Sequence, residues 1–323
     1  MQQGINYKRT FILLHLVVLF LLGGCGGGGG EAPVPRGTFV ASGGNGSMLT
    51  SHDGIKWDMR PSGVAGEFSK VIQGNDTFVI WQNTGALSAT ILSSTDLMHW
   101  TVRSSNTFPA ISAMIYANNL FVAVSPLGSV LTSPDGANWT SAATLDGALQ
   151  AIAYGNGTFV TVSSSGIIYH SRDCANWTPS PLIPTSLYTV AYGNGIFVAA
   201  GGSDIFTSSD GESWTAKSFN LFPIPHIFSL DTGKNMFVAL GWKSADPLPA
   251  MLMIINSPDG LNWSAEPSPV NISSANMSFA NDRFFLTGSN GTILTSRDGV
   301  NWKARMSGTT ENIGSVTFVD LVL

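Results

Sequence analysis

A short motif, Ser-x-Asp-Gly-x-x-Trp, recurs along this chain at a nearly constant interval. Two of its copies replace the glycine, one with Leu97 and one with Cys174. Successive motif tryptophans are 37 to 49 residues apart, and a period near 40 is typical of a four-stranded propeller blade with its turns. The motif residues are Asp53, Asp96, Asp135, Asp173, Asp210, Asp259 and Asp298, with Trp57, Trp100, Trp139, Trp177, Trp214, Trp263 and Trp302. The repeat predicts an all-β chain that forms a seven-bladed β-propeller over residues 37–323.

The residues around each motif repeat as well. Ala153–Val160 is matched by Ala191–Val198, and both contain a Gly-Asn-Gly sequence that is typical of a tight hairpin turn. Each unit therefore contains four short strands, with the motif as the turn between the third and the fourth. In that turn the aspartate can accept backbone N–H groups, the glycine supplies a positive φ, and the tryptophan covers the turn.

This motif resembles the Asp-box, or BNR, repeat of sialidases and related propellers, usually written Ser-x-Asp-x-Gly-x-x-Trp. The residue between Asp and Gly is missing here, so the motif is a variant. The resemblance covers residues 37–323 and implies a propeller fold. It implies little about function, because Asp-boxes serve architecture in enzymes and in non-enzymes alike.

The two ends of the repeat region complement each other. Residues 36–40 align with a second strand, so the first blade lacks its first strand. Residues 314–319 align with a first strand that has no blade. We therefore expect the C-terminal strand to complete the first blade, close the ring and remove an exposed sheet edge.

The N-terminus has the pattern of a bacterial lipoprotein. Lys8 and Arg9 precede the apolar run 11–22, which has the length of a signal peptide and is too short to span a bilayer as a helix. The run ends in Leu22-Gly23-Gly24-Cys25, which resembles the lipobox and implies that Cys25 carries the lipid. The sequence thus predicts a signal peptide over residues 1–24 and a lipidated cysteine with a glycine-rich tether over 25–36. The alternative is a simple signal peptide or anchor with an incidental cysteine.

A lipid on Cys25 would make the membrane a partner of this chain and place it in the bacterial cell envelope. Gly26 stands where an aspartate retains some lipoproteins at the inner membrane, which favours the outer membrane. The formal net charge is −5 and includes the basic Lys8 and Arg9, so the rest of the chain is more acidic still. This charge argues against nucleic acid as a partner.

Sequence patterns for cofactors, metals or catalysis are lacking. The histidines of the mature part, His52, His99, His170 and His226, fall in different blades, and we expect them to be exposed residues without a role as metal ligands. A glycosidase needs two carboxylates at the substrate, and the sequence singles out no such pair. We therefore favour a non-enzymatic module that binds a protein or a glycan. The alternatives are a carbohydrate-active enzyme, sialidase-like or another glycosidase, and a structural surface protein without a small ligand.

Two blades depart from the repeat between their second and third strands. From the second-strand Phe to the motif Trp there are 22 residues in blade 2 and 26 in blade 6, against 17 or 18 in the other five. Loops carry function where the scaffold repeats, so these insertions predict the binding face, opposite the motif turns. The candidate ligand-binding residues are Trp81, Trp242, Lys243 and Asp246, with both tryptophan rings expected to be exposed. The alternative is that the rings pack against neighbouring loops.

Overall fold

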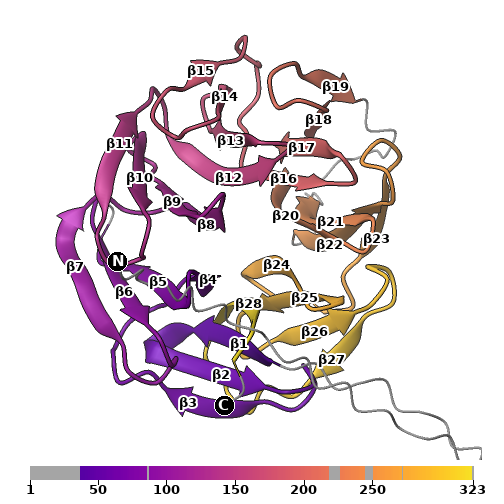
Figure 1. The fold of residues 1–323 in the computed structure, drawn as a ribbon. Helices are drawn as coiled ribbons and strands as arrows, with labels where there is room; N and C mark the ends of the chain where they lie inside the picture. Colours follow the sequence, from indigo (N-terminus) through magenta and orange to yellow (C-terminus); the bar gives the residue numbers. More distant parts are fainter. Residues whose placement is uncertain (1–36, 86, 218–225, 244–249, 271, 322–323) are drawn as a thin grey trace, which may run out of the picture. The chain divides into compact units, whose positions relative to one another are not determined.

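The computed structural model describes residues 37–85, 87–217, 226–243, 250–270 and 272–321. Within these residues, seven four-stranded antiparallel sheets form a ring around a central channel (Figure 1). One 3-10 turn, η1 (Gly44–Gly46), is the one helical element of the described part. The predicted all-β, seven-bladed propeller is confirmed. The predicted signal peptide and tether, residues 1–24 and 25–36, lie outside the described residues.

Each blade contains four strands, which follow one another from the channel to the rim. Blade 1 contains β28 (Ile313–Val319), β1 (Thr38–Gly43), β2 (Ser47–Ser51) and β3 (Asp58–Pro61). Blade 2 contains β4 (Ile72–Gly74), β5 (Thr77–Asn83), β6 (Ala89–Ser94) and β7 (Thr101–Phe108). Blade 3 contains β8 (Ala113–Ala117), β9 (Leu120–Val124), β10 (Ser129–Ser133) and β11 (Thr140–Thr144). Blade 4 contains β12 (Leu149–Gly155), β13 (Thr158–Ser163), β14 (Ile168–Ser171) and β15 (Thr178–Pro179).

The remaining three blades follow the same order. Blade 5 contains β16 (Thr189–Gly193), β17 (Ile196–Gly201), β18 (Asp204–Ser208) and β19 (Thr215–Lys217). Blade 6 contains β20 (His226–Gly233), β21 (Met236–Lys243), β22 (Met251–Ser257) and β23 (Ser264–Pro267). Blade 7 contains β24 (Ala275–Ala280), β25 (Arg283–Gly288), β26 (Ile293–Ser296) and β27 (Lys303–Arg305).

The C-terminal strand closes the ring. β28 pairs antiparallel with β1 over six residue pairs, from Thr38–Val319 to Gly43–Ile313. The Thr38 hydroxyl also donates to the Leu321 carbonyl at 2.6 Å. The expectation that the last strand completes the first blade is confirmed, and the inner edge of β1 is paired.

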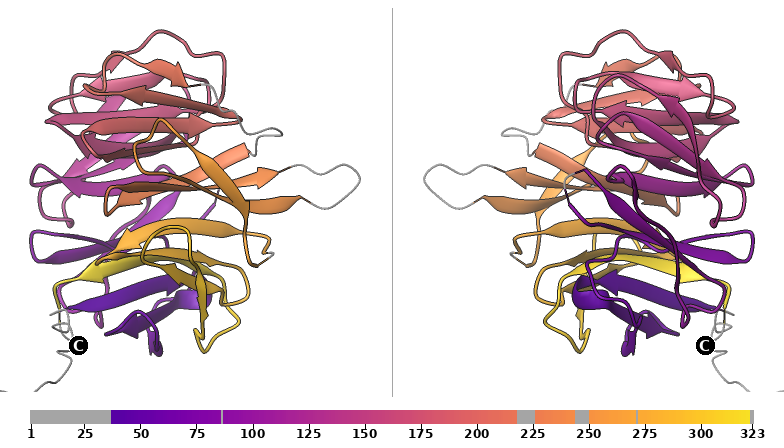
Figure 2. Two further views of the ribbon diagram at one scale, coloured as in Figure 1. Left: turned by 90° about the vertical axis from the view of Figure 1, so that its right-hand side faces the viewer. Right: turned by 90° about the vertical axis from the view of Figure 1, so that its left-hand side faces the viewer.

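The antiparallel order gives the ring two different faces. The motif turns and the hairpins between first and second strands lie together on one face, which we call the motif face. Their proximity is visible in side-chain contacts between neighbouring blades, since Asn75 Nδ2 donates to Pro134 O at 3.4 Å and Asn194 Nδ2 donates to Pro258 O at 2.9 Å. The opposite face carries the other connections, and on that side β21 and β22 project beyond the ring (Figure 2).

Blades pack on one another through the motif turn. Gly136 has a φ of +71°, and a Cβ added there would lie 2.6 Å from Cγ2 of Val79 in the preceding blade. The two motif copies without glycine also have positive φ, 63° for both Leu97 and Cys174. Both side chains are buried in clusters that join two blades, Cys174 beside Val122 of blade 3. The repeat thus places one residue of each turn in the interface with the preceding blade.

Hydrogen bonds inside each motif turn follow one pattern. In blade 3, Oδ1 of Asp135 accepts the N–H groups of Ala137 at 2.9 Å and Asn138 at 2.8 Å, and the Ser133 hydroxyl at 3.0 Å. The Ser133 oxygen accepts the Gly136 N–H at 2.9 Å. All seven motif aspartates accept the N–H groups two and three positions further on. The carboxylate therefore replaces the missing backbone partners of a turn.

These hydrogen bonds change the acidity of the motif carboxylates. The N–H groups of Asn138 and Ala137 hold the pKa of Asp135 well below its ordinary value of 3.8. In blade 2 the His99 ring, 2.7 Å from Oδ2 of Asp96, is the first cause that lowers the pKa of Asp96. Because the ionised form makes the bonds of the folded turn, protonation opposes folding.

We expect the propeller to lose stability in acid through these turns. The unfolded-state pKa of an aspartate is about 3.9, and the folded-state pKa of Asp135 lies below it. The stabilisation is therefore complete above about pH 5 and is lost progressively as the pH falls below the unfolded-state pKa towards the lower folded-state pKa. Urea unfolding of D135N should show a loss of about 1 kcal/mol at neutral pH and a smaller pH dependence between pH 5 and pH 3. Asp76, at an exposed hairpin tip, gives the control D76N. A D135N protein with the pH dependence of the unmodified protein would contradict this account.

Candidate functional site

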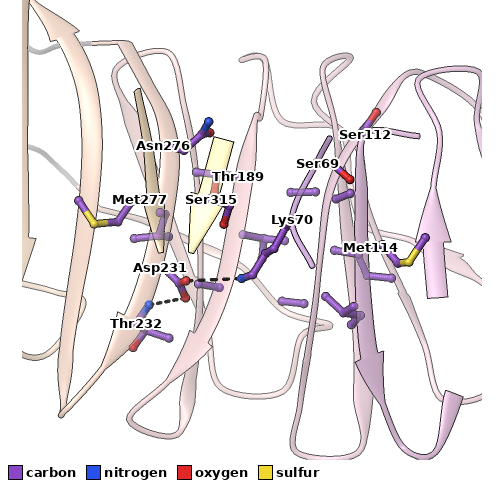
Figure 3. A pocket seen from close by; sticks show the side chains of 18 of the residues that line it. Ser69, Lys70, Ser112, Met114, Thr189, Asp231, Thr232, Asn276, Met277 and Ser315 are labelled. Carbon is purple, nitrogen blue, oxygen red and sulfur yellow. Dashed lines mark hydrogen bonds and ion pairs between the residues drawn. The ribbon is translucent and has the colours of Figure 1, made fainter. Parts of the chain in front are cut away.

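The central channel contains a cavity of about 550 Å³. The inner strands β8, β12, β16, β20, β24 and β28 line it, together with the segment that leads into β4. Ser69, Ser112, Thr189, Asn276 and Ser315 bring polar groups to its wall (Figure 3). The cavity therefore combines small polar side chains with apolar ones such as Met114 and Met277.

An ion pair bridges this cavity. Nζ of Lys70, which precedes β4 in blade 2, lies 4.0 Å from Oδ2 of Asp231 on β20 in blade 6 (Figure 3). The two side chains are 40% and 26% exposed. Asp231 is further held by backbone N–H groups, since Oδ1 accepts that of Thr232 at 2.8 Å and Oδ2 accepts that of Phe279 in blade 7 at 2.9 Å. The carboxylate is thus fixed by the backbone, whereas the lysine contributes a flexible, partly exposed charge.

Asp231 is a departure from the repeat that the sequence analysis missed. The strand pairing places one residue of each blade at the same register position of the innermost strand. These residues are Ile72, Ile115, Ala153, Ala191, Asp231, Ser278 and Thr317. Asp231 is the one charged residue in this set, and the blade alignment alone could have singled it out. Lys70 lies in a connection between blades, where the repeat gives no reference residue.

The expected exposure of Trp81 is wrong. Trp81 lies within β5 rather than after it, and its side chain is 6% exposed. Its Nε1 donates to the Ile111 carbonyl at 3.1 Å, and the ring packs with Ile91 and Met114. It forms part of the cavity wall, but as a core residue between blades 2 and 3. Trp81 is three residues after Phe78, and the equivalent residues Val124 of β9 and Val162 of β13 are also buried within their second strands.

The other candidate residues belong to blade 6. Trp242 lies within β21, half-buried, and its ring stacks on Phe228 with centroids 5.8 Å apart and an interplanar angle of 15°. Lys243 is the last residue of β21 and is also half-buried. Asp246 lies outside the described residues. The structure does not bring Trp81 and Trp242 together, because they belong to blades on different sides of the channel.

The described residues that line this cavity offer few groups for acid–base, metal or thiol chemistry. Asp231 is the one carboxylate among the described residues that line it, whereas a glycosidase of the two-carboxylate type needs a second within about 5–10 Å. The part of the chain that the structure describes holds no cluster of three or more His, Cys, Asp or Glu side chains arranged for a metal ion. Cys174 is buried, and burial raises the pKa of its thiol to about 12.

The four histidines were expected to be exposed and without a role as metal ligands. His52, His99 and His226 are exposed, but His170 is half-buried, and its Nδ1 is buried without a hydrogen-bond partner, so its expected exposure is wrong. Arg103 and Arg305 lie on the outermost strands β7 and β27, where they donate to Ser93 and Thr295 hydroxyls at 2.7 and 2.8 Å. These two guanidinium groups are therefore remote from the channel.

Among the described residues, no helix has the length and apolar composition needed to cross a membrane.

No protein-family model matches the sequence, and no curated protein matches it either. The fold is similar to many solved structures.

Two of these similar structures are of YCF48. The first, YCF48 bound to D1 peptide, is 18% identical with a TM-score of 0.53, and the match covers 73% of this chain and 81% of that one. YCF48 from Cyanidioschyzon merolae is 15% identical with a TM-score of 0.57, covering 78% and 88%. The Pan2 WD40 domain of Neurospora crassa is 12% identical with a TM-score of 0.55, covering 74% and 78%. At these identities the similarity establishes the propeller fold alone.

Because Trp81 is buried and Trp242 is only half-buried, we expect their replacement by alanine to destabilise the protein to different extents. W81A should lower the free energy of unfolding by about 3–5 kcal/mol, because it removes a large buried ring and one of the two donors to the Ile111 carbonyl, the other being Asn83 Nδ2. W242A, which removes a half-buried stacked ring, should cost about 1–2 kcal/mol. Chemical denaturation of both variants checks this order. Equal stability of W81A and the unmodified protein would show that the ring is not part of the core.

Proposed function

We propose that this chain is a lipoprotein of the bacterial cell envelope whose propeller binds a segment of a partner protein in its central channel. The observation that carries the proposal is the cavity with the Lys70–Asp231 pair across it. Its volume of about 550 Å³ falls in the range of ligand sites, about 300–1,000 Å³. A few fixed polar groups in a partly apolar wall are typical of such sites.

The ion pair suits a ligand that carries charge. Lys70 can turn its ammonium group to a carboxylate of an incoming segment, because its side chain is flexible and partly exposed. Asp231 keeps its two backbone N–H bonds when Lys70 leaves, so its charge stays hydrogen-bonded. The wall also offers the hydroxyls of Ser112 and Ser315 to the backbone of a peptide. A peptide segment with an acidic residue or a free carboxylate is therefore the ligand that this geometry fits best.

A structural neighbour supports a peptide ligand. YCF48, which has the same fold at 18% identity, is described in complex with D1 peptide. This shows that a ring of the same fold binds a peptide in that protein. For the present chain it supports a protein partner over a glycan.

The lipid anchor rests on the N-terminal sequence. The basic residues, the apolar run and Leu22-Gly23-Gly24-Cys25 occur in the order of a lipoprotein signal. Acylated Cys25 would hold the propeller at the envelope through the tether that follows it. Gly26 favours the outer membrane as the location.

Site-specific crosslinking in the native host tests the proposal. The photoreactive amino acid p-benzoylphenylalanine replaces Ser112 or Ser315 in the full-length chain, and Thr178 on the exposed rim strand β15 in a control. We expect positions 112 and 315, but not 178, to crosslink to the same segment of one partner protein. Adding K70M should lower the apparent affinity for that partner about tenfold, which corresponds to about 1.4 kcal/mol. K217M, the same change on the rim strand β19, should leave the affinity unchanged.

Two results would overturn the proposal. Crosslinks from position 178 that equal those from 112 and 315 would place the partner on the rim. Crosslinks from the channel positions that do not respond to K70M would show that the ion pair has no part in binding.

A further inference from the structure

In each motif turn, the residue directly after the glycine position lies on the motif face, next to the position that packs against the preceding blade. Four of these residues are large and apolar: Leu261 is 48% exposed, Val300 53%, Ile55 40% and Met98 59%. They belong to blades 6, 7, 1 and 2, which are consecutive around the ring. The corresponding residues of blades 3, 4 and 5 are Ala137, Ala175 and Glu212. We call Leu261, Val300, Ile55 and Met98 the apolar arc.

Cavities between blades adjoin three members of the apolar arc. Val300 lines a cavity of about 220 Å³ between blades 6 and 7. Ile55 lines one of about 460 Å³ between blades 7 and 1, together with Met306, which is 88% exposed. Met98 lines a third, of about 110 Å³, between blades 1 and 2. Apolar residues grouped in this way beside open grooves indicate a contact surface.

The chain enters the propeller at the middle of this arc. Phe39 of β1 pairs with Ser51, the first residue of the motif of blade 1. The start of β1 therefore lies on the motif face, in the blade that carries Ile55. Residues 26–36 separate this point from Cys25, and a chain of that length spans at most about 40 Å. A lipid on Cys25 would keep the apolar arc within this distance of the bilayer.

The motif face carries charges of both signs around the apolar arc. Exposed Lys56 lies beside Ile55, and exposed Arg297, close to Val300, pairs with Asp282 at 3.8 Å. The motif aspartates lie on the same face and stay ionised, because the N–H groups of each turn stabilise the carboxylate. Apolar side chains can enter the headgroup boundary while neighbouring basic side chains stay at its surface, as in other interfacial contacts.

We propose that the apolar arc rests on the lipid bilayer to which Cys25 is anchored, so that the motif face is turned towards the membrane. This inference rests on the lipid anchor of the proposed function and adds an orientation to it. The opposite mouth of the channel then points away from the membrane, where the segment of a partner can reach Lys70 and Asp231.

Depth-dependent quenching in vesicles tests this orientation. M98C and V300C are labelled with an environment-sensitive fluorophore in the full-length lipidated protein, which is then inserted into vesicles of phosphatidylethanolamine and phosphatidylglycerol. Spin-labelled lipids serve as quenchers. A175C provides a matched control at the same turn position of blade 4, and L127C an exposed apolar position on the opposite face. Cys174 is buried, so the label attaches to the introduced thiol.

We expect a shift of emission to shorter wavelength and quenching at positions 98 and 300, and neither at 175 and 127. Equal signals at all four positions would overturn the orientation. A shift at 98 and 300 that appears without lipid, and grows with protein concentration, would also overturn it, because a second copy would then cover the arc. The N-terminal mass is measured on the same sample. Absence of an acyl group on Cys25 contradicts the anchor itself, whereas an acylated protein with unquenched probes contradicts the orientation alone.

Discussion

The pairing of β28 with β1 is the constraint on which the rest of this structure depends. Among the described residues, neighbouring blades share no backbone ladder, since each of the seven sheets ends at the channel and at the rim, and a single bridge, Gly202–Ile227, joins blades 5 and 6. The covalent chain joins each blade to the next in sequence, but blade 7 and blade 1 are joined only because the last strand crosses into the first blade. Without it, β1 would expose a row of unpaired N–H and C=O groups to the channel.

The closing strand also organises the channel. The Thr317 hydroxyl donates to the Val71 carbonyl in blade 2 at 2.8 Å, and the Val316 N–H donates to the Ser278 hydroxyl in blade 7 at 3.2 Å. The next link in the same direction is the Phe279 N–H, which donates to Asp231 in blade 6. These hydrogen bonds therefore link blade 2 to β28, β28 to blade 7, and blade 7 to blade 6. The ion pair of Lys70 and Asp231 joins the two ends of this series of hydrogen bonds across the cavity, so the geometry of the candidate site depends on the closure.

The architecture could be predicted from the sequence because seven copies of the motif independently indicate the same four-stranded blade. Each copy of the motif specifies the same turn, and the two half-blades at the ends fit only one topology. The positions of individual side chains in the altered blades were harder to predict. A longer interval between Phe78 and Trp100 can lengthen a loop or extend two paired strands, and the spacing is the same in both cases. In blade 2 the added residues lie beyond Trp81, which occupies the same buried second-strand position as Val124 in blade 3 and Val162 in blade 4.

The candidate site was missed for a related reason. Lys70 and Asp231 are far apart in the sequence, and each stands alone in its own segment. Only the closed ring brings them within 4.0 Å. Asp231 could have been found as the one charged residue at its register position, but its partner lies in a connection that the repeat does not define. A repeat therefore predicts the strands and turns that all blades have in common, whereas the candidate site consists of residues that differ from the repeat.

Native-state hydrogen exchange of the β28 amides tests the closure most directly. If the ring depends on this strand, the amides of Thr317 and Val319, which face β1, exchange only through global unfolding, at the rate of central amides such as that of Val160 in β13. The amide of Thr178, the one N–H of the short rim strand β15, exchanges faster. Exchange of the β28 amides at the rate of β15, while β13 remains protected, would show that the strand detaches without unfolding the propeller and would contradict the account.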